Sequence, residues 1–306
     1  MFARPLVILS RNRFVRGVLL MALAGAVACR GGNAGVSGAG SSTVNVVAAE
    51  NFYGDLVKQL GGPAVKVTSI ISDPNADPHE YESSSGNAKA IAAARLVIVN
   101  GAGYDSFMDK LLAASPNRER KVVNAAGILG KKDGDNPHVW YDVSGMQQVA
   151  DQITQALQEL DPAGSDAYAM RNQRFKASLQ PLLDRMGAIR AKYAGTHLTQ
   201  TEPVFGYMGD ALGLTIDDGE FQHAIEEGND PSPQAVAAIN QEISTRSVRA
   251  LLYNSQTTNP TTTNLKNLAK QNNVPIVGVS ETEPPNETYQ GWMLSQLSAL
   301  QTALGG

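Results

Sequence analysis

Cysteine, histidine and tryptophan are scarce in this 306-residue chain, which contains one Cys, four His and two Trp. A single Cys excludes a disulfide framework and a zinc site built from cysteines. Basic residues are also few. The first 28 residues hold four Arg and no acid, so the remaining 278 have 21 basic and 29 acidic residues and a net charge of −8. This balance excludes nucleic acid as a partner, because neutralising phosphates needs a basic surface.

The N-terminal segment has the pattern of an export signal. Arg11, Arg13 and Arg16 precede an apolar stretch of about 11 residues, and the small residues 26–28 follow it. This stretch is too short to span a bilayer, which takes about 20 apolar residues. We therefore predict a signal peptide over residues 1–28 and an exported protein.

The residue after this signal is Cys29. A run of small residues that ends in Cys resembles the bacterial lipobox, in which the Cys is lipidated and becomes the new N-terminus. The alternative is a plain signal peptide with an incidental Cys. Residues 29–43 are rich in Gly and Ser, a composition that behaves as a flexible tether. We therefore predict a lipid anchor to the membrane, on its periplasmic or extracellular face.

Strand and helix patterns alternate after the tether, which predicts parallel sheets in an α/β fold. The first lobe is expected over residues 44–160 and the second over residues 196–306. Strands are predicted at 44–48, 65–71, 96–99, 121–123, 214–216, 248–253 and 275–279, and helices at 52–60, 87–94, 104–114, 144–160, 204–212, 233–243, 262–271 and 288–304.

Residues 161–195 interrupt this alternation. Apolar residues recur there at helical spacing, which predicts one long connecting helix between the lobes. Pro181 lies in its interior and should kink or interrupt it, because proline lacks the backbone N–H and its ring clashes with the preceding turn. The expected fold is therefore two α/β lobes with parallel-type sheets joined by one long helix.

Two of the four histidines share a local setting. His79 follows Asp-Pro and His138 follows Asn-Pro, each in a loop where ligand groups of open α/β sheets gather. The preceding proline stiffens the loop and can pre-place the imidazole. Two unrelated surface histidines are the alternative, but two Pro-His pairs at equivalent positions favour one shared site. His197 and His223 are expected at the surface or rim.

A site with two His needs oxygen ligands to hold a divalent transition metal, since there is no second thiolate. Glu202 precedes a predicted helix, where interaction with the helix dipole is the simpler role. Glu281 and Glu283 follow the apolar strand 275–279 and could equally be surface acids. We expect Glu281 rather than Glu283 in the site, because Glu281 is nearer the carboxyl edge of the sheet.

Residues 77–82, 136–140 and 202–207 resemble the substrate-binding proteins of zinc- and manganese-importing ABC transporters. The resemblance extends from Val44 to Leu304. It implies a metal site in the cleft between the two lobes, with His79, His138, Glu202 and an acid among residues 281–283 as ligands. Two departures stand out: Glu202 replaces the His of many zinc-dedicated members, and there is no His-rich loop.

The resemblance implies a receptor that captures Zn²⁺ or Mn²⁺ outside the membrane and delivers it to an ABC permease. We expect a monomer and no enzymatic activity. One alternative is a metal-dependent hydrolase or oxygenase, but the His-Glu-x-x-His helix is absent from the sequence. The other is a surface adhesin with the same fold. The sequence does not decide between zinc and manganese.

Overall fold

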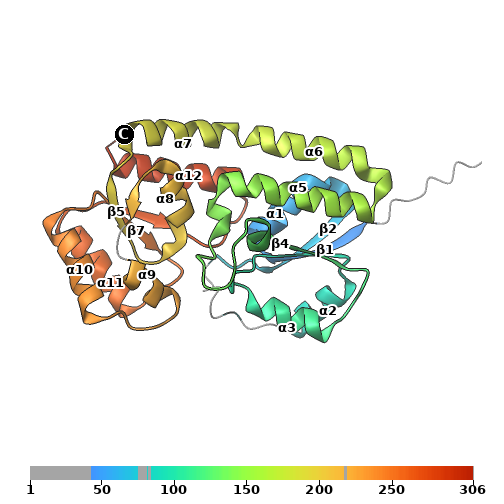
Figure 1. The fold of residues 1–306 in the computed structure, drawn as a ribbon, viewed down its shortest axis with the longest axis horizontal. Coiled ribbons are helices and arrows are strands. Elements are labelled where there is room, and N and C mark those ends of the chain that lie inside the picture. Colours follow the sequence, from blue (N-terminus) through green and yellow to red (C-terminus); the bar gives the residue numbers. More distant parts are fainter. Residues whose placement is uncertain (1–42, 75–80, 82–83, 217–218, 306) are drawn as a thin grey trace, which may run out of the picture. The chain divides into compact units, whose positions relative to one another are not determined.

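The computed structural model describes residues 43–74, 81, 84–216 and 219–305. Of the residues predicted to have a function, Cys29 and His79 lie outside this part of the chain. The described strands form two separate four-stranded sheets, each within one of the two predicted lobes (Figure 1). No helix in the described part is both long and apolar enough to cross a membrane.

The first sheet has the strand order β2-β1-β3-β4, and all neighbouring strands are parallel. Val46 of β1 pairs with Val67 of β2 and with Leu96 of β3. Runs of Val, Ile and Leu suit such strands, because a parallel sheet is covered on both faces. The strands are β1 (Val44–Glu50), β2 (Val65–Ile71), β3 (Leu96–Val99) and β4 (Lys121–Asn124).

Alternate residues of β1 pack into different apolar clusters on the two faces of this sheet. Val46 and Ala48 belong to the cluster that contains α1 and α5, whereas Val47 and Ala49 belong to the cluster that contains α2 and α3. This follows from the two-residue period of a strand. The helices of this lobe are α1 (Asn51–Gly61), α2 (Ser85–Ala93), α3 (Ser106–Ala114), α4 (Ala125–Ile128) and α5 (Val143–Leu160).

The second sheet has the strand order β6-β5-β7-β8 and is also parallel. Its strands are β5 (His197–Gln200), β6 (Thr215–Ile216), β7 (Leu251–Asn254) and β8 (Ile276–Val279). The helices around it are α8 (Gly206–Leu212), α9 (Gly219–Glu226), α10 (Pro233–Thr245), α11 (Pro260–Gln271) and α12 (Tyr289–Ala303). These two parallel sheets with their helices confirm the predicted α/β fold.

Two elements of the second lobe differ from the sequence-based expectation. His197 begins β5, and the acidic segment before residue 227 forms α9, where no strand or helix was predicted. β5 has only four residues, two of them Thr and Gln, so its sequence lacks the apolar run of a typical buried strand. Its pairing with both β6 and β7 supplies the hydrogen bonds that local propensity does not.

The connector consists of two consecutive helices rather than one. α6 (Ser165–Ser178) and α7 (Gln180–Tyr193) follow one another end to end (Figure 1), and the break is at Leu179. Pro181 occupies the second position of α7, where a missing N–H costs no hydrogen bond within that helix. The interruption expected from Pro181 is therefore present. Leu179 keeps right-handed helical angles (φ −79°, ψ −12°), so the break is local.

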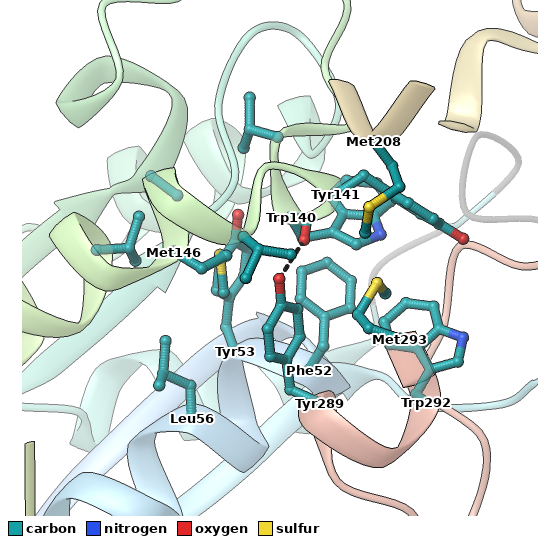
Figure 2. Packing of buried hydrophobic residues seen from close by; sticks show 14 of the residues in the cluster. Phe52, Tyr53, Leu56, Trp140, Tyr141, Met146, Met208, Tyr289, Trp292 and Met293 are labelled. Carbon is teal, nitrogen blue, oxygen red and sulfur yellow. Dashed lines mark hydrogen bonds between the residues drawn. The ribbon is translucent and has the colours of Figure 1, made fainter. Parts of the chain in front are cut away.

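Aromatic side chains from both lobes pack together in one core (Figure 2). The rings of Phe52 and Trp140 stack with centroids 4.6 Å apart. The ring centroid of Trp292, in α12, lies 5.9 Å from that of Phe52 and 6.0 Å from that of Tyr141. Such ring pairs contribute about 0.5–1.5 kcal/mol each beyond the area that they bury. Phe205 of the second lobe reaches Tyr141 at 5.6 Å, so the core is continuous between the lobes.

Polar contacts join the lobes beside this core. The side chain of Asn51 donates to the carbonyl of Glu283 at 2.7 Å and accepts the backbone N–H of Glu283 at 3.0 Å. The Tyr141 hydroxyl donates to the carbonyl of Ser280 at 2.8 Å. Glu283 is only 6% exposed. Burial, with a contribution from the nearby charge of Asp55, raises the pKa of the Glu283 carboxyl to about 8.

This raised pKa makes stability depend on pH. Below about pH 4.5 Glu283 is protonated in both the folded and the unfolded state. As pH rises from there to about 8, only the unfolded state releases the proton, so the free energy of unfolding falls.

We expect E283Q to abolish this loss of stability and to melt several degrees above the parent at pH 8–9. Thermal melts of the metal-free protein from pH 5 to 9 measure it. The exposed E119Q should follow the parent curve, and an E283Q curve parallel to the parent's would contradict the assignment.

Candidate metal site

A cavity of about 730 Å³ opens between loops of the two lobes. Residues 102–104 and 134–137 line it from the first lobe, and Pro203 and residues of α9 line it from the second. Two predicted ligands are next to these lining residues in the sequence. His138 follows residues 134–137, and Glu202 precedes Pro203. Glu281 joins them through contacts described below.

Asn136 fixes the orientation of the His138 ring. Its amide nitrogen donates to the carbonyl of Pro203 at 2.7 Å, and its amide oxygen accepts the backbone N–H of His138 at 3.0 Å. The same oxygen lies 2.8 Å from His138 Nδ1. Because this oxygen can only accept, Nδ1 carries the proton of this contact, so Nε2 is the ring nitrogen that could bind a metal ion.

His138 Nε2 faces the carboxylate of Glu281. The nitrogen is 3.4 Å from Glu281 Oε2, and both side chains are fully buried. The phenol of Tyr104 donates to the same oxygen at 2.8 Å. Burial, followed by the nearby charges of Glu281 and Glu50, raises the pKa of Tyr104 well above its ordinary value, so the phenol is a neutral donor. The structure thus places an imidazole of the first lobe against an acid of the second.

Asn254 connects the two predicted carboxylate ligands. Its amide nitrogen donates to Glu202 Oε2 and, at 2.6 Å, to Glu281 Oε1. All three side chains are buried. Although Glu202 caps a short helical turn that begins at Pro203, its carboxylate makes no capping hydrogen bond.

The order of the strands explains this arrangement. Glu202 comes two residues after β5, Asn254 ends β7, and Glu281 comes two residues after β8. In the sheet β7 lies between β5 and β8. Because parallel strands end at the same edge, the two glutamates approach from either side and Asn254 lies between them.

Glu226 of α9 also approaches His138, and the sequence did not single it out. Its Oε1 is 3.6 Å from His138 Nδ1, and its side chain is 9% exposed. Its other oxygen is 3.6 Å from Nδ1 of His223, whose side chain is 61% exposed and lines the cavity. His223 is therefore a rim residue, as expected. The helical spacing of the buried residues Phe221 and Ile225 could have predicted α9 and so placed Glu226. Gly219 and the acidic residues of this segment made the helix hard to recognise from the sequence.

Two further acids lie behind Tyr104. Asp105 accepts the backbone N–H groups of Asn100 and Gly101 at 2.7 and 2.9 Å, which fixes the loop that carries Tyr104. Burial raises the pKa of Asp105 to about 6 despite these bonds. Glu50, at the end of β1, is fully buried, and burial followed by the charge of Asp105 raises its pKa well above the ordinary value. Burial therefore shifts both acids toward the neutral form, although a pKa of about 6 leaves Asp105 mostly ionised at pH 7.

The remaining predicted residues lie elsewhere. Glu283 contacts Asn51, as described above, and His197 is exposed in β5. His79 lies outside the described residues. Within the described part, no three His, Cys, Asp or Glu side chains are grouped so that they could hold a metal ion. The structure brings together His138 and Glu281, and it links Glu281 to Glu202 through Asn254.

Comparison with known proteins identifies the family. Residues 46–303 match the model of a family described as zinc-uptake complex component A, periplasmic. The chain belongs to this family. Membership confirms the resemblance seen in the sequence and the predicted function class, a metal-binding receptor of an importer. The comparisons give no support to the hydrolase and oxygenase alternatives.

Similar curated proteins are named as metal receptors. The chain is 23% identical over 311 residues to the metal ABC transporter substrate-binding lipoprotein ScbA of Streptococcus cristatus, which covers 94% of this chain and 97% of that protein. It is 26% identical over 238 residues to the manganese-binding lipoprotein MntA of Halalkalibacterium halodurans, covering 75% of this chain and 77% of that protein.

Solved structures share the fold. The periplasmic zinc binding protein TroA from Treponema pallidum has a TM-score of 0.73 at 20% identity, covering 85% of this chain and 99% of that one. A mutant of the laminin-binding adhesin of Streptococcus agalactiae has a TM-score of 0.70 at 22% identity, covering 85% and 99%. At these identities the likeness shows the fold alone, so the second structure does not support an adhesin function here.

The role of Asn136 can be tested by removing its amide. We expect N136A to lower the affinity for Zn²⁺ by about 10–100-fold, the usual cost of losing a group that orients a metal-binding histidine. Competition against a chelating dye measures the affinity. Y207F is the matched control, because it removes the hydroxyl that donates to the Asn136 carbonyl at 2.7 Å without touching the imidazole. Equal losses in both variants would contradict an orienting role for the amide.

Proposed function

We propose that this chain captures a divalent transition-metal cation with His138, Glu202 and Glu281 and hands it to an ABC permease. His79 is the fourth proposed ligand, on the strength of its Asp-Pro-His sequence alone. In this role the cavity between the lobes binds and releases the cation, and no residue performs a catalytic step.

The observation that carries the proposal is the separation between His138 Nε2 and Glu281 Oε2, which is 3.4 Å. Two neighbouring ligands of a tetrahedral zinc ion, each about 2.1 Å from the metal, lie about 3.4 Å apart. Nε2 is the ring nitrogen that could bind a cation, because Nδ1 donates to Asn136. A cation could therefore bind both atoms with little movement of either lobe.

The charge of the site supports the same conclusion. Glu202 and Glu281 are buried, and burying two carboxylates is costly unless their charge is compensated. Asn254 and Tyr104, both neutral, donate to these carboxyl groups. A divalent cation between the two acids would stabilise their ionised form in this buried setting.

The types of ligand indicate a divalent transition-metal ion. Nitrogen and carboxylate donors suit both Zn²⁺ and Mn²⁺, and intrinsic affinity favours zinc. Among the relatives, MntA is named as manganese-binding and TroA as zinc binding. We propose that this chain binds either ion, as a monomer.

Attachment to the membrane is the other part of the proposal. Relatives such as ScbA and MntA are named lipoproteins. Cys29 follows a signal-like segment and precedes a Gly/Ser-rich stretch, which supports a lipid anchor and a tether. The tether would let the folded body reach a permease while remaining at the membrane.

Metal binding is tested by thermal melting. Zn²⁺ or Mn²⁺ at about one hundred times its dissociation constant should add about 2.7 kcal/mol to the free energy of unfolding, because only the folded state binds it. H138A and E281A should lose this shift while still folding, because each removes a proposed metal-binding atom while the rings of Phe52, Trp140 and Trp292 remain packed. E283A is the matched control and should retain it, since Glu283 contacts Asn51 through its backbone and is not a proposed ligand. The absence of any shift in the parent would overturn the function, and a loss in E283A alone would reassign the ligand.

The anchor is tested by cell fractionation. C29A should move the protein from the membrane to the soluble fraction, because the single lipid attachment point is lost. The melting behaviour with metal should not change, since residue 29 is not among the proposed ligands. A C29A protein that stays with the membrane would show that Cys29 is not the anchor.

A further inference from the structure

Asn254 makes an unusual pair of hydrogen bonds, because one amide nitrogen donates to two buried carboxylates. The partners are Glu202 Oε2 and Glu281 Oε1. An amide nitrogen has two hydrogens. The two short contacts are to the carboxylates, and the third contact of this nitrogen, to the Thr257 hydroxyl, is longer at 3.4 Å. One oxygen of each acid is thereby committed to Asn254.

The remaining oxygen of Glu281 points the other way. Glu281 Oε2 faces Nε2 of His138 at 3.4 Å and accepts the Tyr104 phenol. The two oxygens of this carboxylate therefore have different neighbours: Asn254 on one side and the imidazole of the first lobe on the other. A cation beside His138 would meet one oxygen of Glu281, not both.

Asn254 itself is held in one orientation. Its backbone N–H donates to the hydroxyl of Thr201 at 3.0 Å, and its side-chain oxygen accepts the backbone N–H of Gln256 at 3.1 Å. With the oxygen committed to an N–H donor, the amide nitrogen must point at the two acids. The residue is fully buried at the end of β7, so water does not compete for these bonds.

We propose that Asn254 is a specificity-determining residue that restricts Glu202 and Glu281 to one coordinating oxygen each. This inference rests on the proposed function. Carboxylates that bind through both oxygens raise the coordination number of a metal ion, as they do in calcium sites. Single-oxygen binding keeps the number low and suits the four-coordinate tetrahedral geometry of Zn²⁺ over the octahedral geometry typical of Mn²⁺.

The test compares zinc and manganese affinities in the parent, N254A and N254S. Both variants lack the amide, so both carboxylates are released and can bind through two oxygens. We expect zinc affinity to fall by about 10–100-fold, in the range for loss of an outer partner of a metal ligand. Manganese affinity should fall less or rise, so the zinc-to-manganese affinity ratio drops by about tenfold or more. Isothermal titration with chelator competition measures both ions.

Cobalt(II) reports the coordination number directly, because tetrahedral Co²⁺ absorbs visible light far more strongly than octahedral Co²⁺. The parent should show the intense spectrum and the variants the weak one. A weak spectrum in the parent would overturn the inference whether or not the variants fold. An unchanged affinity ratio in folded N254A or N254S would also overturn it. If the parent binds no metal at all, the proposed function fails instead.

Q256A is the matched control. Gln256 is a buried amide in the same loop, and its side-chain oxygen accepts the backbone N–H groups of Glu281 and Thr282 at 2.5 and 3.1 Å. It supports the main chain of the ligand loop rather than a carboxylate. We expect Q256A to lower both affinities in parallel and to retain the intense cobalt spectrum. A ratio change in Q256A as large as in N254A would show that loosening the loop is sufficient, which would overturn the specific role of Asn254.

Discussion

Packing of aromatic rings between the two lobes is the constraint on which the site depends. Phe52 and Trp140 from the first lobe stack at 4.6 Å, and Trp292 from the second lies against Phe52. Trp140 is two residues from His138, and the ring of His138 lies 5.1 Å from it. Because protein interiors are close-packed, these rings cannot shift independently. The packed core therefore fixes the position of the imidazole relative to the second lobe, and with it the position of the predicted ligand atom Nε2.

Within this frame, the second lobe holds two carboxyl groups close together before any cation arrives. Glu202 and Glu281 both accept from Asn254, whose own position is fixed by further hydrogen bonds. The strand order places Asn254 on the central of the three strands, between the acids. Such an arrangement reduces the reorganisation that binding requires, since the donors already hold the carboxylates near one another. It also explains why the amide matters as much as the acids themselves.

The sequence predicted the fold well, because buried parallel strands are short apolar runs and the amphipathic helices alternate with them. β5 was missed because Thr and Gln dilute its pattern, and α9 was missed because acids surround it. Pro181 correctly indicated the break at Leu179, but the remaining helical angles there could not be read from residue types. In the site, the Pro-His pairs and the acids after strands were visible in sequence. Asn136, Tyr104 and Asn254 were not assigned roles, because their importance comes from partners distant in the chain.

Asn136 lies in the first lobe and forms a hydrogen bond to the second, and this link couples metal binding to the contact between the lobes. Its nitrogen donates to Pro203 of the second lobe while its oxygen accepts from the ring of His138. A cation on Nε2 would withdraw electrons from the ring and make the Nδ1 proton a stronger donor to that oxygen. Hydrogen bonds in a chain polarise one another, so the bond to Pro203 would strengthen too. Coupling of this kind is reciprocal: whatever the cation adds to the link between the lobes, separating the lobes must subtract from the affinity for the cation.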